Sequence, residues 1–118
     1  MTFSHLITKC NAVILLGKPI LERASTKHPQ ARDWLIDWEK TVVKAEWRSI
    51  TEVRDSFPSA DGIPLGKGRS KIVVTCFNVG GNDFRLLTQI VYSRRFVQVE
   101  AVLTHAEYST DRWKKRFL

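Results

Sequence analysis

Arginine, histidine and tyrosine side chains lie at or next to strands expected in the second half of the sequence, without an obvious pair of carboxylates. The three residues are Arg85, His105 and Tyr108. Groups of this kind suit RNA cleavage, in which the ribose 2′-hydroxyl attacks the adjacent phosphate and needs no metal-bound water. Histidine transfers protons near neutral pH, arginine stabilises charge on phosphoryl oxygens, and tyrosine stacks on a base or takes part in proton transfer.

Basic residues outnumber acidic ones, and the excess is uneven along the chain. The 118 residues include 19 Lys and Arg against 12 Asp and Glu, which gives a formal net charge of +7. Residues 61–118 carry +5 of this charge. Such a balance suits a polyanion, an anionic membrane surface or an acidic protein, although a merely solvated basic surface has the same composition. If the partner is RNA, the expected binding residues are Lys67, Arg69, Lys71, Arg112, Lys114 and Lys115.

Motifs for other kinds of chemistry are missing. The sequence has neither G-x-G-x-x-G nor a Walker motif. His105-Ala106-Glu107 matches the H-x-E of zinc deaminases, but no P-C-x-x-C accompanies it. Cys10 and Cys76 are the only cysteines, too few for a zinc quartet or a disulfide framework. We therefore expect free thiols in the cytoplasm, no metal and no cofactor.

Neither a membrane span nor a signal peptide is expected. The longest apolar run, Ala12–Leu16, is far shorter than the roughly 20 residues that a membrane helix needs. The N-terminus lacks the pattern of a basic region, an apolar stretch and a small-residue cleavage site.

The elements that position these residues indicate one α+β domain over residues 1–118. The first 60 residues are predicted to be mostly helical, after a short strand at Thr2–Thr8. Helices are expected over much of Leu15–Lys27, where Gly17-Lys18-Pro19 interrupts the start, at Gln30–Glu46 and at Ser49–Phe57. The last has a capping box between Ser49 and Glu52.

In the second half of the chain the apolar residues recur with a period of two, which predicts strands, and the short connections between them predict an antiparallel meander. Phe57–Arg69 is expected to be loop, and strands are expected at Ser70–Asn78, Asp83–Tyr92 and Phe96–Thr104. Helices would cover one face of this sheet, against Val97, Val99, Ala101 and Leu103 of the last strand. The other face would be more polar and open to a ligand, with Arg85, Gln89, Gln98 and Glu100 on it. Ala106–Leu118 would form a helix or a loose extension.

Two blocks of sequence resemble the HigB family of bacterial type II toxins. Phe77-Asn78-Val79-Gly80-Gly81-Asn82-Asp83-Phe84-Arg85-Leu86 is similar to the family's F-N-(I/V)-G-G-N-x-(Y/F)-R-L, and Thr104-His105-Ala106-Glu107-Tyr108 to its T-H-x-E-Y. The resemblance runs in order from about His5 to Tyr108. It includes Lys27-His28-Pro29, Lys44-Ala45-Glu46-Trp47 and Phe57-Pro58-Ser59-Ala60-Asp61. The chain departs from the family after Tyr108 and at Cys10–Pro19.

This resemblance implies a compact RelE-like toxin that cleaves mRNA on the ribosome and is held inactive by a HigA-type antitoxin. It implies cleavage by basic and aromatic residues rather than by a metal. Arg85 would stabilise the phosphate, His105 would act as acid or base, and Tyr108 would stack on a base or transfer a proton.

Two other functions stay open at this point. The ParE branch of the same superfamily acts on DNA gyrase, and a fold alone does not decide between targets. A non-catalytic basic RNA-binding module would explain the charge but gives His105 no role. The His105 and Tyr108 pair favours RNA cleavage.

Overall fold

The structure is a computed structural model that describes residues 12–118. The strand expected at Thr2–Thr8 and Cys10 therefore lie outside the described residues. Helices and strands follow in the order β1 (Ile14–Leu16), α2 (Lys18–Lys27), η1 (Pro29–Ala31), α3 (Arg32–Val43), α4 (Ile50–Ser56), β2 (Asp61–Leu65), η2 (Gly68–Ser70), β3 (Ile72–Val79), β4 (Phe84–Val91), η3 (Tyr92–Arg94), β5 (Phe96–Thr104), α5 (His105–Ser109) and η4 (Arg112–Phe117).

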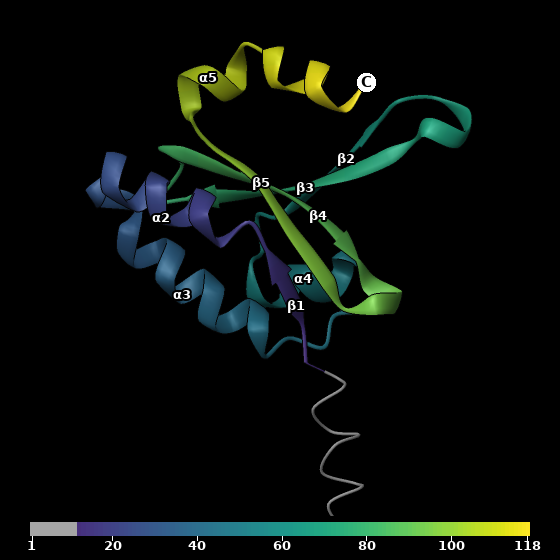
Figure 1. The fold of residues 1–118 in the computed structure, drawn as a ribbon, viewed down its shortest axis with the longest axis horizontal. Helices are drawn as coiled ribbons and strands as arrows, with labels where there is room; N and C mark the ends of the chain where they lie inside the picture. The colour runs from purple at the N-terminus through teal and green to yellow at the C-terminus, as the bar shows by residue number, and fades with distance from the viewer. Residues whose placement is uncertain (1–11) are drawn as a thin grey trace, which may run out of the picture.

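One five-stranded sheet organises the fold, in the order β1-β5-β4-β3-β2 (Figure 1). The expected meander of β3, β4 and β5 is confirmed, with antiparallel pairing throughout. Gly80, Gly81 and Asn82 all have positive φ in the tight β3–β4 turn, as their residue types predict. The α+β class is therefore confirmed, although the parallel pair of β1 and β5 makes the sheet mixed.

The segment expected to be loop contains a strand. Asp61–Leu65 forms β2 and pairs antiparallel with β3, so the prediction of loop throughout Phe57–Arg69 was wrong. Pro64 is compatible with this strand because β2 lies at the edge of the sheet, where a missing N–H breaks no inner ladder.

The start of the first predicted helix is interrupted at Gly17, as expected, and the residues before Gly17 form a strand. Residues Ile14–Leu16 form β1, and Gly17 turns the chain into α2 with φ 89°. A Cβ at Gly17 would lie 2.6 Å from the Val99 carbonyl oxygen, so this close approach to β5 requires glycine.

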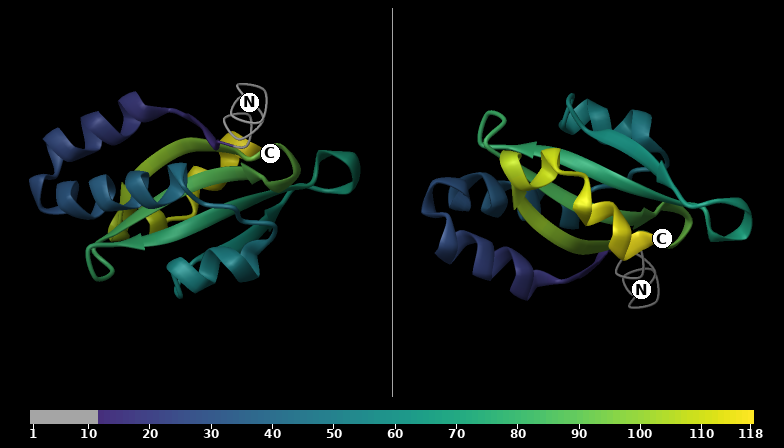
Figure 2. Two further views of the ribbon diagram at one scale, coloured as in Figure 1. Left: turned by 90° about the horizontal axis from the view of Figure 1, so that it is seen from below. Right: turned by 90° about the horizontal axis from the view of Figure 1, so that it is seen from above.

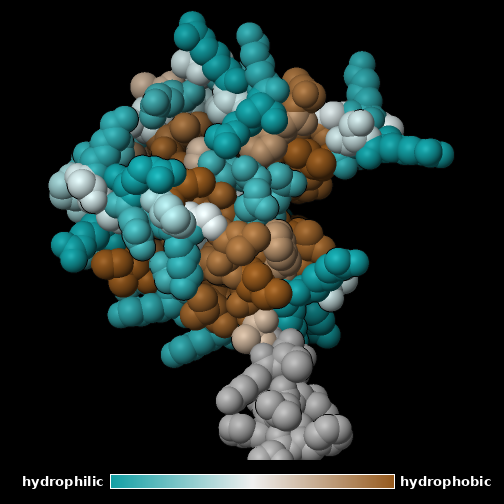
Figure 3. All heavy atoms as spheres, in the orientation of Figure 1, coloured by the Kyte–Doolittle hydropathy of each residue, from teal (hydrophilic) through white to brown (hydrophobic). Residues whose placement is uncertain are grey.

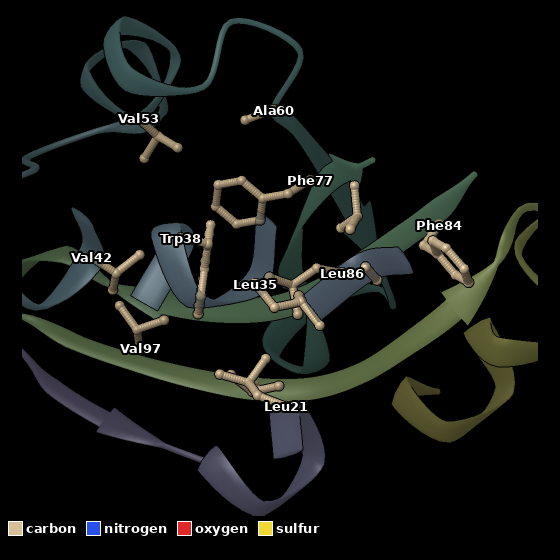
Figure 4. Close-up of a cluster of buried hydrophobic side chains, with 13 residues drawn as sticks. Leu21, Leu35, Trp38, Val42, Val53, Ala60, Phe77, Phe84, Leu86 and Val97 are labelled. Carbon is tan, nitrogen blue, oxygen red and sulfur yellow. The ribbon is translucent and has the colours of Figure 1, made fainter. Parts of the chain in front are cut away.

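Helices α2, α3 and α4 pack on one face of the sheet and form the main core (Figure 4). Leu35, Trp38 and Val42 of α3 are buried, as the helical spacing predicts. The Trp38 ring meets Phe77 of β3 edge to face, with centroids 5.5 Å apart. The tryptophans of this helix therefore act in packing.

The capping box lies on a different helix from the one expected. Ser49 precedes α4 but makes no side-chain cap, and Glu52 accepts from the Arg48 backbone N–H at 2.7 Å rather than from that of Ser49. Thr104 and Glu107 form the reciprocal pair of bonds at the start of α5.

The second face of the sheet is covered rather than open. The chain from α5 to η4 lies across it, opposite the N-terminal helices (Figure 2). Trp113 is buried there in a second apolar cluster with Val74, Cys76, Leu87 and Ala101. The expected open ligand face is therefore wrong, because the tail supplies the aromatic residues that close it.

A β-bulge explains another error in the predicted faces. Leu87 pairs with Ala101, but the next residue, Thr88, pairs with Val99, so Glu100 is an extra residue in β5. The side chains of β5 that follow Glu100 therefore point to the opposite faces from those that strict alternation predicts. Val97 and Val99 face the main core, whereas Ala101 and Leu103 pack in the second cluster.

Candidate active site

Arg85 lies near the start of β4, where its own turn fixes the guanidinium. Its Nη1 donates to the carbonyl oxygens of Asn82 at 2.9 Å and Phe84 at 3.1 Å, and its Nη2 donates to Asn82 Oδ1 at 2.6 Å. The residue is only 8% exposed. All three acceptors are neutral, and within residues 12–118 no carboxylate forms an ion pair with Arg85. The site thus holds a nearly buried, rigid positive charge.

Tyr108 of α5 lies beside this guanidinium. Arg85 Cζ is 5.3 Å from the centroid of the Tyr108 ring, within cation–π distance. Trp113 stacks on the same ring, with centroids 5.4 Å apart and planes 14° apart, and its Nε1 donates to the Tyr108 carbonyl oxygen at 3.0 Å. These contacts occupy much of the ring and make it a support for Arg85.

The Tyr108 hydroxyl is in hydrogen-bonding contact with the buried Cys76 thiol. Burial, with a smaller effect of Cys76, raises the pKa of Tyr108 to about 12. Burial likewise raises the pKa of Cys76 to about 11. Both groups are therefore neutral near pH 7, which disfavours Tyr108 as a general base.

His105 is the first residue of α5, and two local features fix its backbone. Its N–H donates to the Asp83 carbonyl oxygen at 2.9 Å, which extends the β4–β5 ladder. The preceding capping box holds the start of the helix, and the Thr104 N–H bond is the main reason that the Glu107 pKa is lowered. The His105 side chain is exposed, and its Nδ1 lies 3.4 Å from Ser109 Oγ.

The structure brings two of the three predicted catalytic residues into direct contact. Arg85 and Tyr108 are in contact, whereas no hydrogen bond or ring contact joins the His105 side chain to either of them within the described part of the chain. The imidazole is exposed at the start of α5.

The predicted RNA-binding residues form two separate groups. Lys67, Arg69 and Lys71 are exposed on the β2–β3 connection, which projects beyond the rest of the sheet (Figures 1 and 2). In the C-terminal segment, Arg112 and Lys115 are exposed and Lys114 pairs with Asp111 at 3.4 Å. Neither group contacts the Arg85 guanidinium through a hydrogen bond or ion pair in residues 12–118.

Sequence reasoning missed the residues that hold the site in place. Asn82 accepts from Arg85, Trp113 stacks on Tyr108, and Cys76 meets its hydroxyl. The three aromatic residues Tyr108, Trp113 and Phe117 within a basic run were the available signal, because large apolar side chains indicate packing against a core.

Two further findings concern metal binding and membrane-spanning helices in the described residues. No three His, Cys, Asp or Glu side chains in residues 12–118 come together in a group that could hold a metal ion. None of the helices in the same range is long and apolar enough to cross a membrane.

Known proteins are similar to this chain over most of its length. Residues 31–111 match the family model of the HigB toxin, described as the RelE-like toxic component of a toxin–antitoxin system. The mRNA interferase toxin HigB of Escherichia coli K12 is 30% identical over 94 residues, which cover 80% of this chain and 86% of that protein. An mRNA interferase HigB from Escherichia coli O6:H1 is 27% identical over the same shares. The family match spans both blocks that surround Arg85 and His105, and this chain belongs to the HigB family of toxins.

Proposed function

We propose that this chain is an endoribonuclease toxin that cleaves mRNA on the ribosome, in the cytoplasm, until a HigA-type antitoxin restrains it. The observation that carries the proposal is the Arg85 guanidinium, a nearly buried cation held by neutral acceptors beside Tyr108. Membership of a toxin–antitoxin family and relatives named mRNA interferase support it.

In the proposed reaction the RNA supplies its own nucleophile. The ribose 2′-hydroxyl loses its proton to His105 or to water, and its oxygen forms a bond to phosphorus. The bond from phosphorus to the 5′-oxygen breaks, and the 5′-oxygen takes a proton from the other of these two groups. Arg85 stabilises the negative charge that grows on the phosphoryl oxygens. His105 transfers one of the two protons, because imidazole changes charge near neutral pH.

Tyr108 has a supporting role in this proposal. Its ring lies against Arg85 and Trp113, so it keeps the guanidinium in place. Its hydroxyl stays protonated, because burial raises the pKa of Tyr108 to about 12. The neutral hydroxyl donates a hydrogen bond more readily than it accepts a proton. The basic residues of the β2–β3 connection and of the C-terminal segment contribute affinity for RNA.

Mapping mRNA ends on translating ribosomes tests this function. The protein is expressed with and without its antitoxin, and new 5′ ends are sequenced. Wild type should produce new ends, whereas Arg85→Ala and His105→Ala should each lower cleavage by about a hundredfold, the usual cost of losing one transition-state donor or proton-transfer group. Arg94→Ala, which removes an exposed arginine from η3, is the matched control and should cleave normally.

Two outcomes contradict the proposal. Growth arrest without new mRNA ends favours a target such as gyrase. Full cleavage by both the Arg85 and His105 variants, with the protein folded, means that the assigned site is wrong.

A further inference from the structure

A groove runs along the exposed edge of β5, between α2 and the C-terminal segment. The groove exists because β1 pairs only with Phe96–Gln98, so the later part of β5 has no neighbouring strand on that side. It has a volume of about 510 Å³. Its charged and titratable lining consists of Arg23, Lys27, His28, Glu100, Glu107 and Arg116.

Two cations in this groove have no ion-pair partner in residues 12–118. Arg23 and Lys27 lie one turn apart on α2, where side chains four apart share a face. Both are exposed, and neither takes part in a salt bridge of the described chain. Lys27 contributes only an electrostatic influence on Glu107.

The two carboxylates of the groove are already engaged within the fold. Glu100 accepts from Gln89 Nε2 at 2.8 Å and from Gln98 Nε2 at 3.0 Å, and it lies 3.8 Å from Arg116. Glu107 accepts from the Thr104 N–H at 2.9 Å. Both carboxylates are thus held by neighbouring groups, and Arg116 is paired with Glu100. Arg23 and Lys27 are the groove cations that no carboxylate of residues 12–118 pairs with.

His28 adds a rigid aromatic donor between these charges. Its ring packs against Phe84 with centroids 4.7 Å apart, and it belongs to the Lys27-His28-Pro29 segment that the catalytic site does not use. Phe84 packs in the main core, so the next residue, Arg85, has its side chain on the other face of the sheet. Glu107 of the groove precedes Tyr108 in α5. The groove therefore lies at the sheet edge between the two faces, beside the element that carries Tyr108.

The surface around the groove is hydrophilic on the face seen in Figure 3. Polar side chains gather there around α2 and the C-terminal segment, while apolar side chains gather over β1, where Ile14 and Leu16 are exposed. A polyanion suits such an open groove better than a free anion, because it gains from several weak phosphate contacts at once.

We propose that this groove binds an RNA phosphate beyond the cleavage site, with Arg23 and Lys27 as its principal contacts and His28 as a further donor. This inference rests on the proposed function, since the RNA would reach from the groove to Arg85. The ligand is a phosphodiester of the mRNA, because the RNA that reaches Arg85 is the one that is cleaved.

Charge reversal with a matched control tests the groove directly. A fluorescent single-stranded RNA oligonucleotide is titrated with wild type, Arg23→Glu/Lys27→Glu and Lys40→Glu/Lys44→Glu over a salt series. The control pair has the same spacing and charge change on exposed residues of α3 and its C-cap. The groove variant should bind about tenfold or more weakly, and its salt slope should be shallower by about 1.4, or 0.7 for each lost contact. The control should stay within about threefold of wild type.

Equal weakening in both variants would overturn the proposal, because bulk charge would then explain binding. No measurable binding by wild type would overturn it too. Thermal unfolding of all three proteins separates loss of contact from loss of folding, since Lys27 also complements the C-terminal end of α2.

Cleavage and cross-linking distinguish the groove from the proposed function. If wild type makes no new mRNA ends while oligonucleotide binding still depends on Arg23 and Lys27, the proposed function fails and the groove stands. A photoreactive residue at position 24, which lines the groove and leaves Arg23 and Lys27 in place, should cross-link to mRNA on ribosomes. Cross-links to ribosomal RNA alone or to protein alone would contradict the groove.

Discussion

Arg85 combines a positive charge with a geometry that its own turn determines. Burying a cation is costly unless hydrogen bonds satisfy it, and three bonds to Asn82 and Phe84 do so without supplying a negative charge. An ion pair with a carboxylate would have cancelled much of the attraction for phosphate. Neutral acceptors keep the guanidinium in place and leave its charge to act on an anion.

Replacing Asn82 by glycine should therefore weaken cleavage without unfolding the protein. Asn82 has φ 102°, which glycine adopts freely, so Asn82→Gly should change the free energy of unfolding by less than about 1 kcal/mol. The loss of the 2.6 Å bond to Arg85 should lower mRNA cleavage between about tenfold and a hundredfold, because small misplacements of a positioned group are costly. Cleavage at the wild-type rate would show that Arg85 needs no such support.

The buried pair of Cys76 and Tyr108 predicts a loss of stability at high pH. Burial raises the pKa of Cys76 from 9.0 to about 11, so between these values the unfolded thiol is ionised and the folded one is not. The contribution of this thiol to the free energy of unfolding is therefore fully present below pH 9. It falls by about 2 kcal/mol as the pH rises towards 11. Tyr108 extends the fall towards pH 12, because its pKa is raised from 10.0 to about 12.

Denaturant unfolding of wild type and Cys76→Ala at pH 8 and pH 10.5, under reducing conditions, measures this effect. Cys76→Ala should lose less stability between the two pH values than wild type does. Equal losses would mean that the thiol does not titrate differently on folding.

At the scale of elements, regular patterns were predictable and local exceptions were not. The alternation of Phe96–Thr104 gave the bounds of β5, and the spacing of Leu35, Trp38 and Val42 gave the buried face of α3. The bulge at Glu100 adds one residue without changing composition, so the sequence period could not place Ala101 correctly. A proline such as Pro64 interrupts the hydrogen bonds of an inner strand and so predicts a loop. β2 lies at the edge of the sheet, where the missing N–H interrupts no hydrogen bond to a neighbouring strand.

The candidate site shows the same division. The two motif blocks predicted Arg85 and Tyr108 as site residues, and in the structure the two side chains are in contact. The partners Cys76 and Trp113 come from β3 and η4, which are distant from each other in sequence. Only the packing of η4 across the sheet brings them together, and that packing depends on long-range contacts that no local pattern specifies.

The C-terminal segment should therefore be essential for both stability and site geometry. Trp113→Ala removes the buried ring that joins Tyr108 to the second apolar cluster, so it should cost about 3 kcal/mol of unfolding free energy. The Cys76 thiol of the folded Trp113→Ala variant should also react faster with a thiol reagent than the Cys76 thiol of the folded wild type. Lys115→Ala, an exposed change in the same segment, should alter neither property. Unchanged thiol reactivity in Trp113→Ala would mean that η4 is not the cover of Cys76.

At the scale of the whole molecule, the net charge of +7 is divided among surfaces with different tasks. Arg85 acts at the candidate active site, and the groove beside α2 holds cations close to it. Lys67, Arg69 and Lys71 stand apart on the β2–β3 connection, which extends away from the packed layers (Figure 1). Exposed charges on such a projection attract a polyanion at long range and raise its rate of encounter. We therefore expect them to act in association rather than on the reacting phosphate.

Removal of the charges on this projection should thus affect association and spare the chemical step. Lys67→Ser/Arg69→Ser/Lys71→Ser should lower kcat/KM for mRNA cleavage by about tenfold at low salt, with kcat nearly unchanged, and the difference from wild type should shrink as salt rises. The control Lys40→Ser/Lys44→Ser/Arg94→Ser removes three exposed charges elsewhere and should lower kcat/KM much less. A large fall in kcat for the first variant would instead place the projection in contact with the reacting RNA, because steering alone changes how often the complex forms and not how fast it reacts.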